Sequence, residues 1–372
     1  MTNEAYTVIR NSFSLQIPDE QLKKSTAENY SEEVKNEIIE LSKQKKYLPF
    51  VARHLLNLGI DTKFWQEQYD FYKNRNKIII EFVTKLFDDF HNESINSIFV
   101  YENFGGLLVS GGDTALFSSG DVDMCADKTE FEKIDRVFKK YGFELKKQKE
   151  QTHNVFRVGY KGKIGDMDYR FNVMFRPLVR YRMPVSVNES AVIPEDDFSF
   201  YPGTYIKLPS KEALLYMNMM RISVHGYVRS PDMRLYIDVY NCSVNGVDWE
   251  KVIKWAESDG NTVRIVTVAF VANCLFGTSV PDALLKKAED KSTKASELIS
   301  IVCDQDKKRL KTSPGRYERQ LTEYYSDNRS YLSGTAHLIF PEKSWLNEYY
   351  GNPGKGIITS YINYFKFLIR GF

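Results

Sequence analysis

The 372-residue sequence has few cysteines and almost no net charge. Cys125, Cys242, Cys274 and Cys303 are far apart and form no Cys-x-x-Cys pair, which argues against a thiolate zinc site and against a disulfide framework. Lysine and arginine number 51 against 49 aspartates and glutamates. That balance lacks the basic excess of a protein that grips nucleic acid by its phosphates. We therefore expect a cytoplasmic protein that does not bind long nucleic acid.

The sequence also lacks an apolar signal segment and a long uninterrupted apolar run. Its N-terminus is polar, which is not typical of a secretion signal. The longest apolar stretch, residues 263–280, is broken by Arg264, Thr267 and Asn273, so it predicts a buried helix and no transmembrane segment. A P-loop, a His-Glu-x-x-His zinc motif and a long dinucleotide fingerprint are missing too. These absences exclude several common enzyme classes.

Three regions differ in their residue patterns, and together they predict an α+β protein. Residues 1–95 have helical periodicity, and we assign them no chemistry of their own. Residues 96–185 read as strand, glycine loop, strand, helix and two further strands, which predicts a small mixed sheet. Residues 186–372 are mainly helical again. Tyrosine and phenylalanine, 24 of each, are ample material for the cores of the helical regions.

The strongest local signal is a pair of aspartates, Asp121 and Asp123, at alternate positions of a predicted strand. Alternation places both carboxylates on one face, and Val122 and Met124 on the core face. Two neighbouring carboxylates repel each other unless a cation compensates, and hard cations such as Mg²⁺ prefer oxygen ligands. A bare Asp-x-Asp is more often a pair of solvated acids at a strand end. The glycine-rich segment before it, residues 105–120, favours a metal site instead.

Further candidates come from the segment before the aspartates and from the later strands. Asp168 is the expected third carboxylate of a two-metal site, with Asp166 as the alternative and an exposed polar strand face as the competing interpretation. The 157–182 segment is basic and suits triphosphate oxygens, although any one of its cations equally suits a protected strand edge. Its basic residues are Arg157, Lys161, Lys163, Arg170, Arg176, Arg180 and Arg182. The expected nucleotide-binding residues are Gly111, Gly112, Ser118, Ser119, Gly120, Arg170 and Arg176.

One helix of the C-terminal region carries polar residues at helical spacing. Asn218, Arg221 and His225 share one face of the otherwise apolar helix predicted at 211–228. They either border a substrate pocket or form a buried polar network, and the network is the favoured interpretation. On the next helix, Arg234 and Asp238 are four residues apart, which predicts a structural ion pair.

The segment Ser-Ser-Gly-Asp-Val-Asp-Met at 118–124 resembles the paired-acid motif of the polymerase-beta-like nucleotidyltransferase superfamily. The whole chain is similar to a family of bacterial uncharacterised nucleotidyltransferases. The ordered matches are the acid pair, Asp-Tyr-Arg-Phe at 168–171, His-Gly at 225–226, the helix around Asp238, and Val-Asp-Trp-Glu-Lys-Val at 247–252. The resemblance implies a compact nucleotidyltransferase core between two helical regions. Two positions depart from it, because Glu102-Asn103 replaces the family Lys-Gly and Phe117 lies near the family arginine.

The leading functional hypothesis is Mg²⁺- or Mn²⁺-dependent nucleotidyl transfer. Asp121, Asp123 and Asp168 would hold the metal, and an NMP would pass from an NTP, expected to be ATP, to an unidentified acceptor with release of pyrophosphate. The acceptor is a small molecule, sugar, peptide or protein. One alternative is a non-catalytic or regulatory protein of this fold, which Glu102 motivates. Another is a metal-dependent glycosyltransferase that uses the Asp-x-Asp.

The C-terminal tail, residues 358–372, is aromatic and carries Lys366 and Arg370. Docking onto the helical region is the favoured expectation for such a segment. The alternative is contact with a partner or with a membrane surface, because rings and cations together suit an interface.

Overall fold

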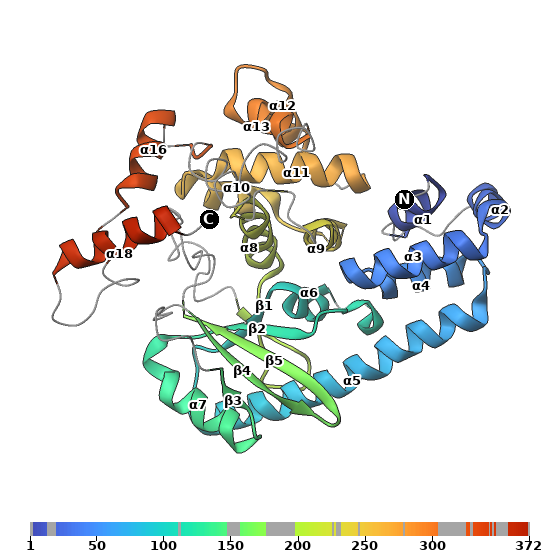
Figure 1. Ribbon diagram of the computed structural model, residues 1–372, viewed down its shortest axis with the longest axis horizontal. Helices are drawn as coiled ribbons and strands as arrows, with labels where there is room; N and C mark the ends of the chain where they lie inside the picture. The colour runs from blue at the N-terminus through green and yellow to red at the C-terminus, as the bar shows by residue number, and fades with distance from the viewer. Residues whose placement is uncertain are drawn as a thin grey trace.

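The chain is α+β, as the sequence predicts, with a small mixed sheet flanked by helical regions (Figure 1). The architecture comes from a computed structural model. It describes residues 3–12, 20–110, 113–146, 157–175, 198–224, 227, 232–244, 246–277, 280–303, 325–327, 330–341, 343, 346 and 356–370.

The N-terminal region is helical, as its periodicity predicts. Its helices are α1 (Asn3–Asn11), α2 (Glu20–Asn29), α3 (Glu32–Lys45), α4 (Leu48–Asn57) and α5 (Thr62–Asn92). Ser31 caps α3, because its hydroxyl accepts the backbone N–H of Val34 at 3.2 Å. The 31-residue α5 runs from this helical region to the sheet (Figure 1), so it is an element that links the two.

The five-stranded sheet has the order β1-β2-β5-β4-β3. The strands are β1 (Phe99–Tyr101), β2 (Asp121–Cys125), β3 (Glu144–Leu145), β4 (Arg157–Ile164) and β5 (Met167–Met174). Strands β2 and β5 are parallel, and the other neighbours are antiparallel. The predicted helix between β2 and β3 is α7 (Phe131–Lys140). The parallel pair places the start of the aspartate strand, Asp121, directly beside the middle of β5.

One face of the sheet is covered by α5 and α7, and this face is apolar. Val122, Met124, Phe171 and Val173 are fully buried there, in one cluster with side chains of both helices. The side chains at the alternate positions therefore point to the opposite face. That opposite face carries the aspartates and most of the charged residues of β4 and β5.

The glycine-rich segment after β1 is a helix in its first part, so the prediction of a loop over residues 105–110 was wrong. Helix α6 (Glu102–Ser110) contains Gly105 and Gly106. A Cβ at Gly105 would lie 3.3 Å from the carbonyl oxygen of Val100, and one at Gly106 would lie 3.8 Å from the Asp238 carboxylate. These glycines let α6 pack closely against its neighbours. The segment that precedes β2 starts again at Asp113 and includes a short 3₁₀ turn, η1 (Thr114–Leu116).

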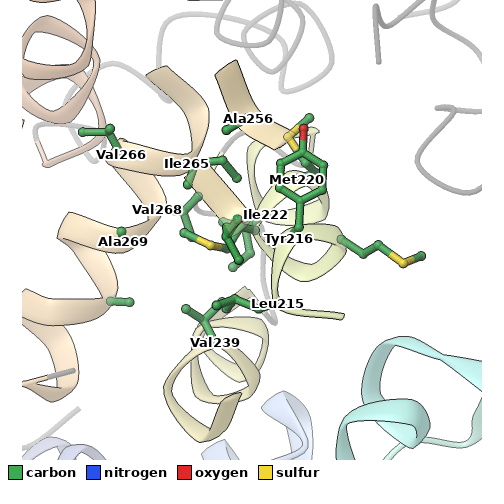
Figure 2. Close-up of a cluster of buried hydrophobic side chains, with 14 of the residues drawn as sticks. Leu215, Tyr216, Met220, Ile222, Val239, Ala256, Ile265, Val266, Val268 and Ala269 are labelled. Carbon is green, nitrogen blue, oxygen red and sulfur yellow. The ribbon is translucent and has the colours of Figure 1, made fainter. Parts of the chain in front are cut away.

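The C-terminal region consists of a two-stranded sheet and several helices. Its elements are β6 (Phe198–Phe200), β7 (Lys207–Pro209), α8 (Lys211–Val224), α9 (Asp232–Val244), α10 (Trp249–Ser258), α11 (Thr262–Phe276), α12 (Asp282–Glu289), α13 (Lys294–Cys303), α16 (Tyr331–Ile339) and α18 (Ile357–Arg370). Figure 2 shows side chains of α8 and α11, among them Leu215, Ile222 and Val268, packed in one apolar core. The buried helix expected within 263–280 is α11. Of the helices in the described ranges, none is long and apolar enough to cross a bilayer.

Helix α18 has a buried side and an exposed side. Ser360 and Tyr364 are buried, and the hydroxyl of Tyr361 donates to the carbonyl oxygen of Pro341 at 3.2 Å. Ile358 and Ile362 are exposed. One side of the tail thus packs on the protein.

Candidate active site

Asp121 and Asp123 lie on β2 and point to the same face of the sheet, as the alternation predicts. Val122 and Met124 between and after them are fully buried on the other face. Asp123 is only 7% exposed, and Asp121 is half-buried. The acid pair is therefore part of the packed structure and does not consist of two solvated side chains at a strand end.

The side chain next to the acid pair is the amide of Asn172 on β5. The parallel register pairs Asp123 with Asn172, and Asn172 is itself buried. Its Nδ2 donates to Asp123 Oδ1 at 2.9 Å and to Asp121 Oδ2 at 3.2 Å. One amide group thus bridges the two carboxylates and reduces their mutual repulsion. The sequence patterns did not single out Asn172 as a site residue.

Asp168 lies on the same sheet face but not beside the acid pair. The strand partner of Asp168 on β4 is Lys163. The partner of Asp121 on β5 is Arg170, two residues after Asp168. Asp168 therefore lies beyond the start of β2, and it is exposed, as is Asp166 in the adjoining turn. In the part of the chain that the structure describes, no three His, Cys, Asp or Glu side chains group in a way that could hold a metal ion. The expected three-carboxylate cluster is thus not formed, because the register places Asn172 where a third acid was expected.

The two serines before the aspartates have different partners. The hydroxyl of Ser119 donates to Asp121 Oδ1. The hydroxyl of Ser118 donates to the backbone carbonyl of Lys46 at 2.5 Å, so it ties this loop to the end of α3. Gly120 is exposed, with open space where a Cβ would lie. The remaining predicted residues of this group, Gly111, Gly112 and Arg176, lie outside the described residues.

The loop before β2 is held by two consecutive residues of α5, Arg75 and Asn76. Arg75 Nη2 donates to the carbonyl oxygens of Phe117 at 2.8 Å and of Ser119 at 3.2 Å. Asn76 Nδ2 donates to the carbonyl oxygens of Phe117 at 2.7 Å and of Thr114 at 2.5 Å. Burial lowers the pKa of Arg75 from its usual value.

These two residues were missed because the N-terminal helices were assigned no chemistry. One signal was available in the sequence. Asn76 is fully buried and lies at helical spacing from the buried Ile79 and Val83, so it interrupts an apolar helix face. A polar residue in such a position needs a hydrogen-bond partner, which the loop carbonyls supply.

Cations border the acid pair on the same sheet face. Lys161 of β4 pairs in register with Arg170, which pairs in turn with Asp121. Both cations are exposed, and Arg157 at the other end of β4 is half-buried. Gly159 is the residue opposite Asn172, and a Cβ there would lie 3.6 Å from Asn172 Oδ1. The sheet surface beside the amide is thus free of a side chain from β4, and it is flanked by positive charge.

A partly buried ion pair lies at the other end of this face. Arg221 of α8 pairs with Glu102, which is 5% exposed. Asn218, one helical turn earlier, is fully buried, whereas the side chain of Arg221 is 24% exposed, so only Asn218 of these two residues lies in the interior. Burial raises the pKa of the neighbouring Tyr101, on which the charges of Asp123, Arg221 and Arg157 also act. His225 and the side chain of Arg234 lie outside the described residues.

Comparison with known proteins gives little further information. No protein-family model matches the chain, and no curated protein matches it either. Among solved structures, the chain is similar to the solution structure of the antibiotic-resistance factor ANT(2'')-Ia, with a TM-score of 0.33 and 13% identity. That similarity covers 50% of this chain and 90% of the other. The functional assignment consequently depends on the geometry of the site itself.

Proposed function

We propose that the chain is a nucleotidyltransferase that moves an NMP from an NTP, with ATP as the expected donor, to a hydroxyl-bearing acceptor. The observation that carries this proposal is the arrangement of Asp121 and Asp123 on one sheet face, bridged by Asn172 and bordered by Lys161 and Arg170. Paired acids attract a divalent cation, and adjacent cations attract phosphate oxygens. A metal-bound triphosphate supplies both groups: a divalent cation for the acids and phosphate oxygens for the cations.

The donor set fits Mg²⁺ or Mn²⁺. Asp121 and Asp123 supply carboxylate oxygens that converge on one amide group, and the side chain of Asn172 also carries an oxygen. When bound, the cation would neutralise phosphate oxygens and help to stabilise the charge that develops during displacement at phosphorus. The residues that would hold it are Asp121 and Asp123.

The other residues of this face act on the phosphates and on the acceptor. Lys161 and Arg170 would hold phosphate oxygens beside the acid pair. The acceptor oxygen would form a bond to the α-phosphorus, the bond to pyrophosphate would break, and the acceptor hydroxyl would lose its proton. Asp168, at the exposed end of β5, is the carboxylate of this face that would accept that proton.

The test is pyrophosphate release by the full-length protein with Mg²⁺ and each of the four NTPs. Wild type should release pyrophosphate, and Asp121→Asn and Asp123→Asn should each reduce the rate by at least about 100-fold. Asp166→Asn is the matched control, because it changes an exposed acid in the turn before β5 and should leave the rate unchanged. Equal turnover by wild type and by both strand variants would rule out the proposed roles.

A second candidate is a protein of this fold that binds nucleotides without transferring them. Two observations favour it: an amide occupies the place of a third acid, and Glu102 stands where the resembled family has lysine. This candidate predicts nucleotide binding by calorimetry without pyrophosphate release. Nucleotide binding that requires Mg²⁺ and is accompanied by turnover would favour the enzyme.

A further inference from the structure

Arg75 of α5 is a partly buried cation whose described hydrogen bonds all go to neutral oxygens. Its guanidinium group donates to Asn76 Oδ1, at 3.0 Å from Nε and 2.9 Å from Nη2, and to the carbonyl oxygens of Phe117 and Ser119. It also lies over the rings of Tyr72 and Phe117, 5.0 and 5.8 Å from their centroids. Within the described residues, none of the ion pairs involves Arg75. Burying a cation is costly, so this placement suggests a specific task.

The hydrogen bonds lead from Arg75 to the acid pair in two steps. Arg75 Nη2 holds the carbonyl oxygen of Ser119 at 3.2 Å, and the hydroxyl of Tyr169 donates to the same oxygen at 3.4 Å. The hydroxyl of Ser119 then donates to the carboxylate of Asp121. The amide nitrogen of Asn76 donates to earlier carbonyls of the loop, those of Thr114 and Phe117. In α5, Arg75 is therefore the residue that acts on the part of the loop adjoining Asp121.

We propose that Arg75 is a positioning residue for the metal-binding carboxylate of Asp121. By fixing the backbone of Ser119, its planar guanidinium group holds the Ser119 hydroxyl against Asp121 Oδ1 and so fixes the orientation of that carboxylate. The inference rests on the proposed function, because it takes Asp121 to be a metal ligand. It adds a residue from the N-terminal helical region to the site.

The geometry and the charge of Arg75 have opposite effects on a cation. A positive charge near the acid pair repels Mg²⁺ or Mn²⁺, so its loss alone would tighten metal binding. Loss of the hydrogen bonds frees the Ser119 backbone, which weakens binding because the carboxylate must then be ordered on association. The sign of the change in metal affinity therefore separates positioning from simple electrostatics.

The test is Mn²⁺ affinity of the full-length protein, measured by isothermal titration calorimetry with thermal melts of each variant. Arg75→Lys keeps the charge but replaces the planar guanidinium group, whose Nη2 holds both loop carbonyls, by a compact ammonium group, and should weaken Mn²⁺ binding about threefold to tenfold. Arg75→Met should also weaken it. Ser119→Ala should weaken Mn²⁺ binding to a similar extent. The double variant Arg75→Met/Ser119→Ala should bind Mn²⁺ no more weakly than the weaker-binding single variant, because both changes act on the same contact. Lys77→Met is the control, since Lys77 is exposed on the same helix and should have no effect.

The outcomes separate this inference from the proposed function. Asp121-dependent Mn²⁺ binding that Arg75→Lys leaves unchanged, or that Arg75→Met tightens, would overturn the positioning role alone. Additive effects of the Arg75 and Ser119 changes would overturn it too. If wild type does not bind Mn²⁺, or if Asp121→Asn binds it as tightly as wild type does, the proposed function and this inference both fail. Should Arg75→Met not fold, Arg75→Lys and Arg75→Gln answer the same question.

Discussion

Glu102, the first residue of α6, forms an ion pair with Arg221 of α8. Glu102 has a φ of 57°, in the left-handed region that residues other than glycine rarely adopt, so the pair is built on a strained backbone position. The negative charge of Glu102 is balanced by an arginine from another region, and the pair joins the sheet to the C-terminal helices.

This pair should contribute measurably to stability. Glu102→Gln leaves Arg221 without its partner and should lower the free energy of unfolding by about 1–3 kcal/mol, less than for a fully buried pair because Arg221 is partly exposed to water. Glu102→Lys should lower it further, because two cations then face each other. Urea unfolding followed by circular dichroism measures both. The control is Glu20→Gln, which breaks the exposed Lys23–Glu20 pair and should have almost no effect; an equal loss in the control would contradict the account.

Asn172→Asp should make stability dependent on a divalent cation. The change places a third carboxylate against Asp121 and Asp123, so without metal the melting temperature should fall by several degrees, the equivalent of about 1–3 kcal/mol. Added Mg²⁺ should restore more of the melting temperature than it adds to wild type. Thermal melts in chelator and in Mg²⁺ measure this. Asn74→Asp adds the same charge at an exposed position of α5 and should show no such Mg²⁺ dependence.

His54 should make the protein less stable in mild acid. It is 4% exposed on α4, and burial, aided by the charge of Arg53, lowers the pKa of its imidazole from 6.5 to about 4. The unfolded chain binds this proton more readily, so stability should fall as the pH drops from about 6.5 to 4, by about 3 kcal/mol in all.

Urea unfolding at pH 7, 5.5 and 4.5 tests this pH dependence. In His54→Leu the free energy of unfolding should fall much less between pH 6.5 and 4 than in wild type, because no imidazole remains to be protonated at this position. His91→Asn changes an exposed histidine and should follow the wild-type profile. A His54→Leu profile as steep as that of wild type would show that other groups cause the acid sensitivity.

Local patterns in the sequence were sufficient for most helices, for strands β1, β2, β4 and β5, and for the shared face of Asp121 and Asp123, but not for α6 or for the short strands β3, β6 and β7. Alternation and capping depend on neighbouring residues, so Ser31 at α3 and Ser210 at α8, which accepts the N–H of Ala213 at 3.1 Å, were both predictable. The glycines of α6 misled the prediction, because they allow close packing against the backbone of Val100 and against Asp238, and Asp238 is far away in the sequence.

The neighbours of the acid pair could not be predicted in the same way. Whether Asp168 or Asn172 lies beside Asp123 is decided by the register of β5 against β2, which depends on contacts between segments about 50 residues apart. Arg75 reaches its loop partners across 42 and 44 residues, and no local pattern records that contact. Asn76 was the exception, because a polar residue on an apolar helix face indicates a buried hydrogen bond.

The central claim is that Asp121 and Asp123 hold the metal of a bound nucleotide. A crystal structure of the full chain with Mg²⁺ and a non-hydrolysable ATP analogue tests it most directly. The account predicts a cation that contacts oxygens of both aspartates and of the phosphates, with the phosphates on the side of Lys161 and Arg170. A nucleotide bound elsewhere, or bound at this face with no cation at either aspartate, would contradict it.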